Sequence, residues 1–275
     1  MNQRAIVQVI ATTVLALFYP FVIAAEAPGR VTQALSGAEI VEHCYYKNGG
    51  EDQRSRLLVT NTLTNGRKVF SEYIRLWKSY GGQDGIVDKV VLYTASAHNK
   101  GLAFMRWGYT NGSDRLADQW VYLPEMRIVK RISKRSPEEM DWGFSDDDLR
   151  VRDIDEDEYR FVEERTVEGK AFYIVESIPK HDPVYGKRIS WFSKGKDWEH
   201  CLESRVDYFD KEMKMVKKQL ITWRKIKGAW VWETGIVKNF RTDSTIVYDA
   251  RDIEVNVGLK GREFSTRALA RGYRR

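Results

Sequence analysis

The chain has 275 residues, with 45 Lys or Arg against 39 Asp or Glu, and a formal net charge of +6. This length suits one domain of the β-barrel or β-sandwich kind after removal of a leader. The charges are interspersed and form no compact basic stripe, so we expect no nucleic-acid partner.

The first 25 residues have the features of a secretory signal. Arg4 precedes an apolar run, which small residues close just before Glu26. The run is nearly long enough for a permanent membrane anchor, but Pro20 interrupts it, which favours cleavage. We therefore expect residues 1–25 to be removed, residues 26–275 to form a single domain, and the mature protein to lie in a bacterial periplasm.

A short helix is expected over residues 31–46. Ser36 can cap its main part, and Ile40, Val41 and Cys44 recur at helical spacing. Cys44 lies far in sequence from the other cysteine, Cys201, and disulfides persist in exported proteins. A bridge between them, two buried free thiols, or pairing with another chain all remain open, whereas the spacing around them predicts no metal site.

Beyond this helix the apolar pattern changes to a period of two residues. Asn65-Gly66 predicts a tight hairpin between strands at 54–63 and 68–80. Five further hairpin turns are expected near residues 96–100, 124, 168–169, 194–197 and 227–228, followed by a last strand over 252–257 and a basic helix over 264–271. We expect a mainly β fold of about 11 antiparallel strands, curled into a barrel or half-barrel.

The sequence offers little to support catalysis. It contains none of the common hydrolase, metalloprotease or nucleotide-binding motifs, and its four histidines form no recognisable arrangement with a nucleophile. The acidic run at 145–149 fits a helix cap better than a calcium loop. We therefore expect no enzyme activity and no cofactor. The nine tryptophans, spread over many strands, suit either a packed core or a cavity for an apolar ligand.

The central segment WVYLPEMRIVKRISKRSPEEMDWGFSDDDL (120–149) resembles the signature of the outer-membrane lipoprotein-sorting family, the LolA-like proteins. A strand ending in YLP is followed by RxVKRI, and then by a Met and FSxxDL at the family's spacing. The later run RISWFSKGKDWEHCLESRVDYFD (188–210) is also similar to the family. Asp141-Trp142-Gly143 and His200-Cys201 depart from its pattern.

The resemblance implies an unclosed antiparallel β-barrel whose helices cover the concave face around an apolar cavity. It implies a periplasmic carrier that binds a lipid or lipoprotein acyl chain, with transient contact to a membrane surface. Residues 140–149 would form a lid. The residues expected to line the cavity or lid are Trp107, Trp120, Tyr122, Met140, Trp142, Phe144, Leu149, Trp191 and Trp223.

Two other functions compete with the carrier. Proteins resembling this branch of the family often accompany inner-membrane exporters of the resistance-nodulation-division (RND) type, so the chain would instead be an accessory binding module of such a pump. A secreted hydrolase is disfavoured because no acid, base and nucleophile can be named.

Overall fold

The computed structural model describes residues 35–97, 100–110, 117–132, 152–181 and 184–273. The predicted signal and the predicted lid residues Met140, Trp142, Phe144 and Leu149 lie outside these ranges. The strands are β1 (Asp52–Thr62), β2 (Lys68–Ser79), β3 (Ile86–Thr94), β4 (Ala103–Tyr109), β5 (Asp118–Leu123), β6 (Ile128–Ile132), β7 (Asp157–Val167), β8 (Lys170–Pro179), β9 (Lys187–Ser193), β10 (Leu202–Phe209), β11 (Met215–Ile226), β12 (Ala229–Asn239) and β13 (Ser244–Val255).

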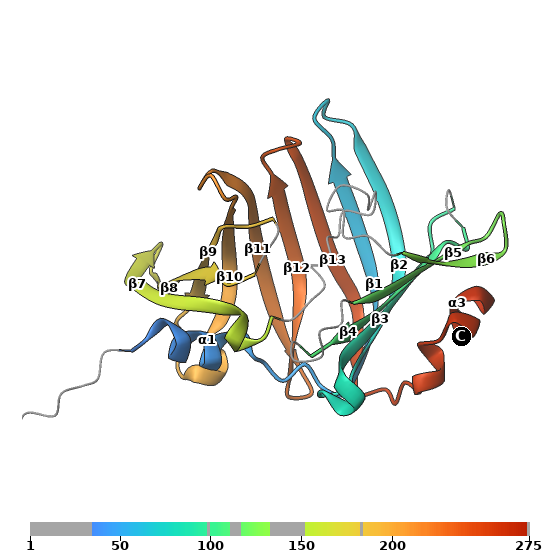
Figure 1. The fold of residues 1–275 in the computed structure, drawn as a ribbon, viewed down its shortest axis with the longest axis horizontal. Helices are drawn as coiled ribbons and strands as arrows, with labels where there is room; N and C mark the ends of the chain where they lie inside the picture. The colour runs from blue at the N-terminus through green and yellow to red at the C-terminus, as the bar shows by residue number, and fades with distance from the viewer. Residues whose placement is uncertain (1–34, 98–99, 111–116, 133–151, 182–183, 274–275) are drawn as a thin grey trace, which may run out of the picture. The chain divides into compact units, whose positions relative to one another are not determined.

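All these strands belong to one antiparallel sheet in the order β6-β5-β4-β3-β2-β1-β13-β12-β11-β10-β9-β8-β7 (Figure 1). Within the described residues β6 and β7 are its two edges, so the sheet is open. This confirms the predicted fold class. The expected number of about eleven strands was too low, because the six predicted turns join twelve strands and β13 makes thirteen.

The last strand is the least accurate of the sequence predictions. β13 begins at Ser244, eight residues before the predicted start, because Ile246, Tyr248 and Ala250 alternate toward the core and are buried. The predicted strand also treated Asp252 as regular, whereas its φ of 51° lies in the left-handed region where the pairing with β1 shifts register.

Two α-helices and four 3-10 turns complete the described structure. The helices are α1 (Gly37–Tyr45) and α3 (Thr266–Arg271), and the turns are η1 (Gln83–Gly85), η3 (Ile154–Glu156), η4 (Trp198–His200) and η5 (Gly261–Glu263). Ser36 caps α1 as predicted: its hydroxyl accepts a hydrogen bond from the Glu39 amide at 3.2 Å. None of the described helices is long and apolar enough to span a membrane.

The strand register defines two faces of the sheet. Register partners place Val175, Ser190, Val206, Gln219, Val237 and Ile246 opposite one another from β8 to β13. We call this the inner face. α1 packs on it, because Ile40, Val41 and Cys44 form one buried cluster with inner-face residues of β8 and β9.

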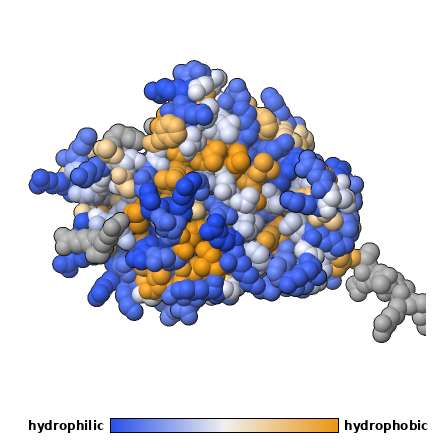
Figure 2. All heavy atoms as spheres, turned by 180° about the vertical axis from the view of Figure 1, so that it is seen from behind, coloured by the Kyte–Doolittle hydropathy of each residue, from blue (hydrophilic) through white to orange (hydrophobic). Residues whose placement is uncertain are grey.

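The alternate residues form the outer face, which α3 covers near β4, β5 and β6 (Figure 1). Leu76, Val91 and Met105 are register partners there and pack against Leu269 of α3. Farther along, Ile236 and Leu220 lie opposite each other and are 36% and 41% exposed. Seen from behind the view of Figure 1, hydrophobic residues gather between hydrophilic ones on the surface (Figure 2).

Candidate functional site on the inner face

An apolar zone occupies the inner face where the sheet runs from β12 through β13 and β1 to β4. Strand alternation explains its composition, since residues two apart, such as Val90 and Leu92, point to the same side. All its core members are at most 8% exposed. They are Leu57, Val59, Tyr73, Val90, Leu92, Phe104, Val237, Ile246 and Tyr248, with Trp77, Val121, Ile132 and Trp232 packed against them.

The described helices make their main contacts elsewhere on the sheet. α1 packs mainly against β7, β8 and β10, and α3 packs against β4 to β6 from the outer face. The apolar zone is therefore a buried cluster of aliphatic and aromatic side chains on the inner face, and neither described helix forms its main packing partner.

A charged group borders this zone on β3 and β4. The Asp88 carboxylate accepts one hydrogen bond from Arg106 Nη1 and one from Trp77 Nε1, each at 3.0 Å. The side chains of Arg106 and Asp88 are only 3% and 5% exposed. A Cβ atom at Gly108 would come within 2.6 Å of both groups, so the position needs glycine for this buried ion pair to form.

Arg75 of β2 adds a second cation to this border. Its Nη1 donates to Gln53 Oε1 at 3.0 Å, and its guanidinium carbon lies 5.5 Å from the centre of the Trp232 ring. Burial lowers the pKa of Arg75 to about 10, although the charge of Asp88 acts in the opposite direction. Arg75 therefore remains a cation at neutral pH.

A second, polar zone lies on the inner face between α1 and the strands β7 to β10. It leaves about 60 Å³ for the centres of water molecules, which suits a few waters and is too small for a lipid chain. Its lining residues are Val41, Tyr45, Arg152, Asp157, Tyr159, Ser177, Arg188, Ser190, Phe192, Glu203, Val206 and Tyr208.

Arg152 contacts both carboxylates on the charged side of this polar zone, those of Glu156 and Asp157. Its Nε donates to Asp157 Oδ2 at 3.1 Å, and its Nη2 lies 3.5 Å from a Glu156 carboxylate oxygen. Arg188 approaches the same Asp157 carboxylate at 3.9 Å. Opposite charges thus neutralise one another at the start of β7, and the arrangement stabilises structure more readily than it supplies a reactive group.

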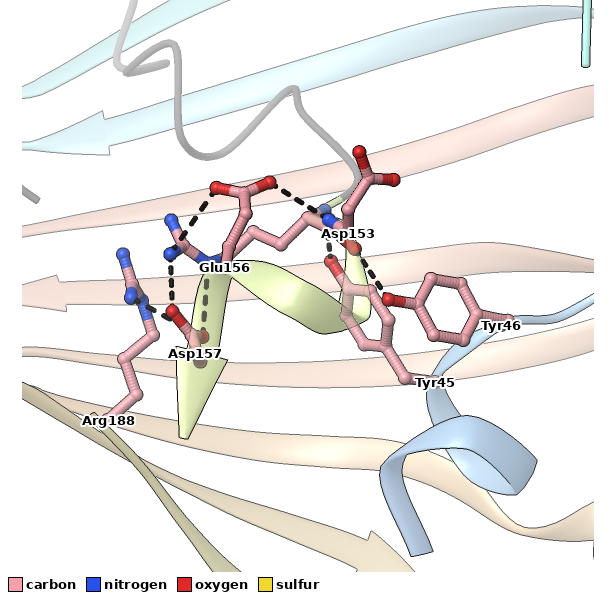
Figure 3. A network of polar contacts seen from close by, with 7 residues as sticks. Tyr45, Tyr46, Asp153, Glu156, Asp157 and Arg188 are labelled. Atoms are coloured by element: carbon pink, nitrogen blue, oxygen red, sulfur yellow. Dashed lines mark hydrogen bonds and ion pairs between the residues drawn. The ribbon is translucent and has the colours of Figure 1, made fainter. Parts of the chain in front are cut away.

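Two tyrosines connect α1 to this network. The Arg152 amide donates to the Tyr45 hydroxyl at 3.2 Å, and the Tyr46 hydroxyl donates to the Arg152 carbonyl at 2.8 Å (Figure 3). Burial raises the pKa of Tyr45 to about 12 and raises the pKa of Tyr46 as well. Both phenols therefore stay protonated at neutral pH and act as hydrogen-bonding groups.

A disulfide fixes α1 on the other side. Cys44 and Cys201 are bonded, with their Cα atoms 4.8 Å apart. Both residues are 1% exposed and lie in the cluster under α1. The helix is therefore attached covalently to Cys201, directly before β10, and by hydrogen bonds to Arg152, which precedes η3 and β7.

Glu203 is a buried carboxyl of the polar zone. Burial raises the pKa of its carboxyl to about 7, while a hydrogen bond with Ser190 and the charge of Arg188 oppose the rise. The Glu203 carbonyl also accepts a hydrogen bond from Trp223 Nε1 at 2.6 Å. Glu203 therefore changes protonation state near neutral pH.

The tryptophans and the tyrosine expected to line a cavity divide between the two faces. Trp107, Trp120 and Tyr122 lie on the outer face in the cluster that α3 covers. Trp191 is also on the outer face, where Arg205 lies over its ring at 4.5 Å. Trp223 is on the inner face, opposite Trp232. Ligand binding by these residues remains a prediction.

Sequence reasoning missed the charged inner-face residues, although a signal was present. Arg75 lies two residues from both Tyr73 and Trp77, and Arg106 lies two residues from Phe104, so each arginine faces the same side of the sheet as these large apolar residues. A charged residue is unusual on the side of a half-buried strand that also carries the large apolar residues. The alternation of residues along β2 and β4 would therefore have identified both arginines as facing the inner side.

Asp197, Glu199 and His200 come close enough together to hold a metal ion, but their known contacts explain the cluster. Asp197 caps η4 by accepting from the His200 amide at 3.0 Å, and Glu199 pairs with Lys225. The acidic residues are exposed, so this turn gives no independent indication of a ligand.

Comparison with known proteins places the chain in a recognised group. A family model described as an uncharacterized protein family matches residues 85–271, which is more than half of the chain. No curated protein matches. A crystal structure of a DUF1329 family protein from Desulfovibrio piger is 26% identical, with a TM-score of 0.75, and covers 85% of this chain and 97% of its own.

Two further crystal structures share the fold. A putative outer membrane lipoprotein-sorting protein domain from Vibrio parahaemolyticus is 20% identical, with a TM-score of 0.74, over 85% of this chain and 98% of that one. A LolA superfamily protein from Nitrosomonas europaea is 14% identical, with a TM-score of 0.62, over 84% and 98%. The open sheet is therefore the fold of lipoprotein-sorting proteins.

Proposed function

Because this chain belongs to the uncharacterized DUF1329 family and has the LolA-like fold, we propose that it is a periplasmic carrier for a lipid or lipoprotein acyl chain. The hydrocarbon binds on the inner face of the sheet. The protein performs no reaction on this cargo and moves it between membranes.

The observation that carries the proposal is the apolar zone on β12, β13 and β1 to β4. Its aliphatic and aromatic side chains share one face and come from six strands. Burial of each methylene group of a ligand contributes about 0.8 kcal/mol, so a chain of a dozen or so carbons supplies strong gross binding before ordering costs. Such a surface needs no specific polar contact with the hydrocarbon.

The polar zone under α1 has a different role in this proposal. Its ion pairs and its small volume make it unsuitable for hydrocarbon, so it holds α1 beside the apolar zone. Among the members of the predicted lining set that the structure describes, Trp223 faces the same side as the apolar zone. The predicted lid over residues 140–149 belongs to the proposal through the family resemblance alone.

Lipid extraction followed by mass spectrometry tests the proposal directly. The mature protein, purified without detergent, is expected to release an acyl-chain lipid and, once delipidated, to bind a fluorescent long-chain fatty acid. A protein that carries no lipid and binds no such probe is not a carrier of this kind.

A matched pair of variants tests the location. Val121→Asp places a charge in the partly buried border of the apolar zone, and Ile236→Asp places the same charge on the outer face. We expect Val121→Asp to weaken probe binding by at least about tenfold, since a carboxylate resists desolvation by hydrocarbon. Ile236→Asp should bind normally. Equal binding by both folded variants would exclude the inner face.

The association with an RND-type exporter remains a separate prediction from the family resemblance. The carrier would receive its cargo from such a pump, so the two functions are compatible. Pull-down from a membrane fraction with the mature protein as bait is expected to recover the transporter, and a bait with Ile236→Asp serves as a surface control.

A further inference from the structure

We propose that Arg75 binds an anionic group on the cargo, either a carboxylate or a phosphate ester, so that the inner face selects an anionic amphiphile. This inference rests on the proposed function, because the hydrocarbon part of the same ligand would occupy the apolar zone. It adds the chemical class of the ligand's polar end.

The position of Arg75 supports this role. It lies on the inner face of β2 between Tyr73 and Trp77, and its register partner on β3 is Leu92. Tyr73 and Leu92 are core members of the apolar zone, and Trp232, under the Arg75 guanidinium, packs against the zone. A ligand whose hydrocarbon lies on the zone therefore has its polar end within reach of this cation.

The charge of Arg75 is not neutralised by an ion pair with any of the described residues. Its hydrogen-bond acceptor is the neutral Gln53 amide, whose own nitrogen donates to the Gly49 carbonyl at 2.7 Å. The nearby carboxylate of Asp88 uses one oxygen for Arg106 and the other for Trp77. Among the described residues, Arg75 therefore has no carboxylate bonded to it.

A partly buried cation without a counter-ion costs free energy in the unliganded protein. The lowered pKa of Arg75, about 10, has the same cause and still leaves the group charged at neutral pH. A guanidinium has five donors in a planar fork that matches a carboxylate or phosphate bidentately. An anionic ligand would supply the missing negative charge and the acceptors.

Binding of matched probes to the delipidated protein tests the inference. The probes are a fluorescent fatty acid, its methyl ester, and an alkyl phosphate of the same chain length. We expect the acid or the phosphate to bind the wild type about tenfold or more tightly than the ester, the size of effect that a charge-assisted hydrogen bond gives. The tighter of the two anions identifies the headgroup class.

Arg75→Gln is expected to remove this preference while leaving affinity for the ester unchanged. Arg75→Lys keeps the charge without the planar fork and should retain part of the preference. Arg56→Gln, which removes an exposed arginine of the outer face, is the control and should bind like the wild type. Arg75→Gln should also unfold at the same or a higher temperature than the unliganded wild type.

The outcomes separate this inference from the proposed function. If the wild type binds acid, phosphate and ester equally, or if Arg75→Gln keeps the preference, Arg75 binds no headgroup and the carrier function stands. If the wild type binds none of the probes, the carrier function fails. A marked loss of stability in Arg75→Gln would show that the arginine has a structural role, and would overturn the inference.

Discussion

Glu203 shows how a single buried carboxyl can connect the stability of the polar zone to pH. Its pKa of about 7 lies above the ordinary value of 4.5, so the folded protein binds more protons than the unfolded chain between those values. The contribution of Glu203 to stability is therefore fully present below about pH 4.5 and is lost as the pH rises to about 7.

Glu203→Gln removes this dependence. We expect the variant to be more stable than the wild type at pH 8, by at most about 3 kcal/mol from the size of the pKa shift, and the difference to shrink toward pH 5. Urea unfolding at the two pH values measures it. Glu199→Gln, which changes an exposed acid, is the control, and a difference that does not vary with pH would contradict the assignment.

The side chain of Asp52 holds the backbone segment that directly follows β13. Its carboxylate accepts hydrogen bonds from the amides of Val257, Gly258 and Leu259 at 2.7, 3.1 and 2.9 Å, and the residue is 1% exposed. Asp52→Ala leaves three donors without this acceptor, so we expect a loss of about 3 kcal/mol in unfolding free energy.

Denaturant unfolding of Asp52→Ala and Asp52→Asn tests that role. The amide variant keeps one acceptor oxygen and should lose less stability than the alanine variant. An exposed change on the same strand, Arg54→Gln, should have little effect. If alanine and asparagine are tolerated equally well, the three amide contacts contribute little to stability.

At the scale of elements, α1 is held by its disulfide as well as by packing. The bridge joins residues 157 positions apart, so it restricts the unfolded chain strongly. We expect Cys44→Ser with Cys201→Ser to lower the unfolding free energy by about 2–5 kcal/mol. Unfolding of the oxidised protein, the reduced protein and the double variant should give matching values for the last two. No loss on reduction would contradict this role.

Elements whose signals are local were predictable from the sequence. The Ser36 cap and the Asn65-Gly66 turn both act within a few residues, and both are present. The irregular backbone at Asp252 in β13 was not predicted, because the register shift there depends on pairing with β1, nearly two hundred positions away. Local pattern contains no information about that partner.

At the scale of the whole described domain, local sequence pattern also fails to predict which face of the sheet the candidate site residues occupy. A period of two residues shows which side chains share a face, but it does not show which face a helix will cover. Trp107 and Trp120 were expected in a cavity, and they pack under α3 because the C-terminal segment returns to the outer face. The charged residues Arg75 and Arg106 face the inner side instead.

Ligand binding to the apolar zone should be measurable as stability of the whole domain. A ligand present at about one hundred times its Kd, and bound only by the folded state, stabilises that state by about 2.7 kcal/mol. For a domain of this size each kcal/mol raises the Tm by about 2–4 °C, so a saturating fatty acid should raise it by about 5–10 °C. At the same probe concentration Val121→Asp should show a much smaller rise, and Ile236→Asp should show the full rise, because only the first changes the inner face. An equal rise in both variants would mean that the probe binds elsewhere, since the inner-face charge would then have no effect on the linkage between binding and folding.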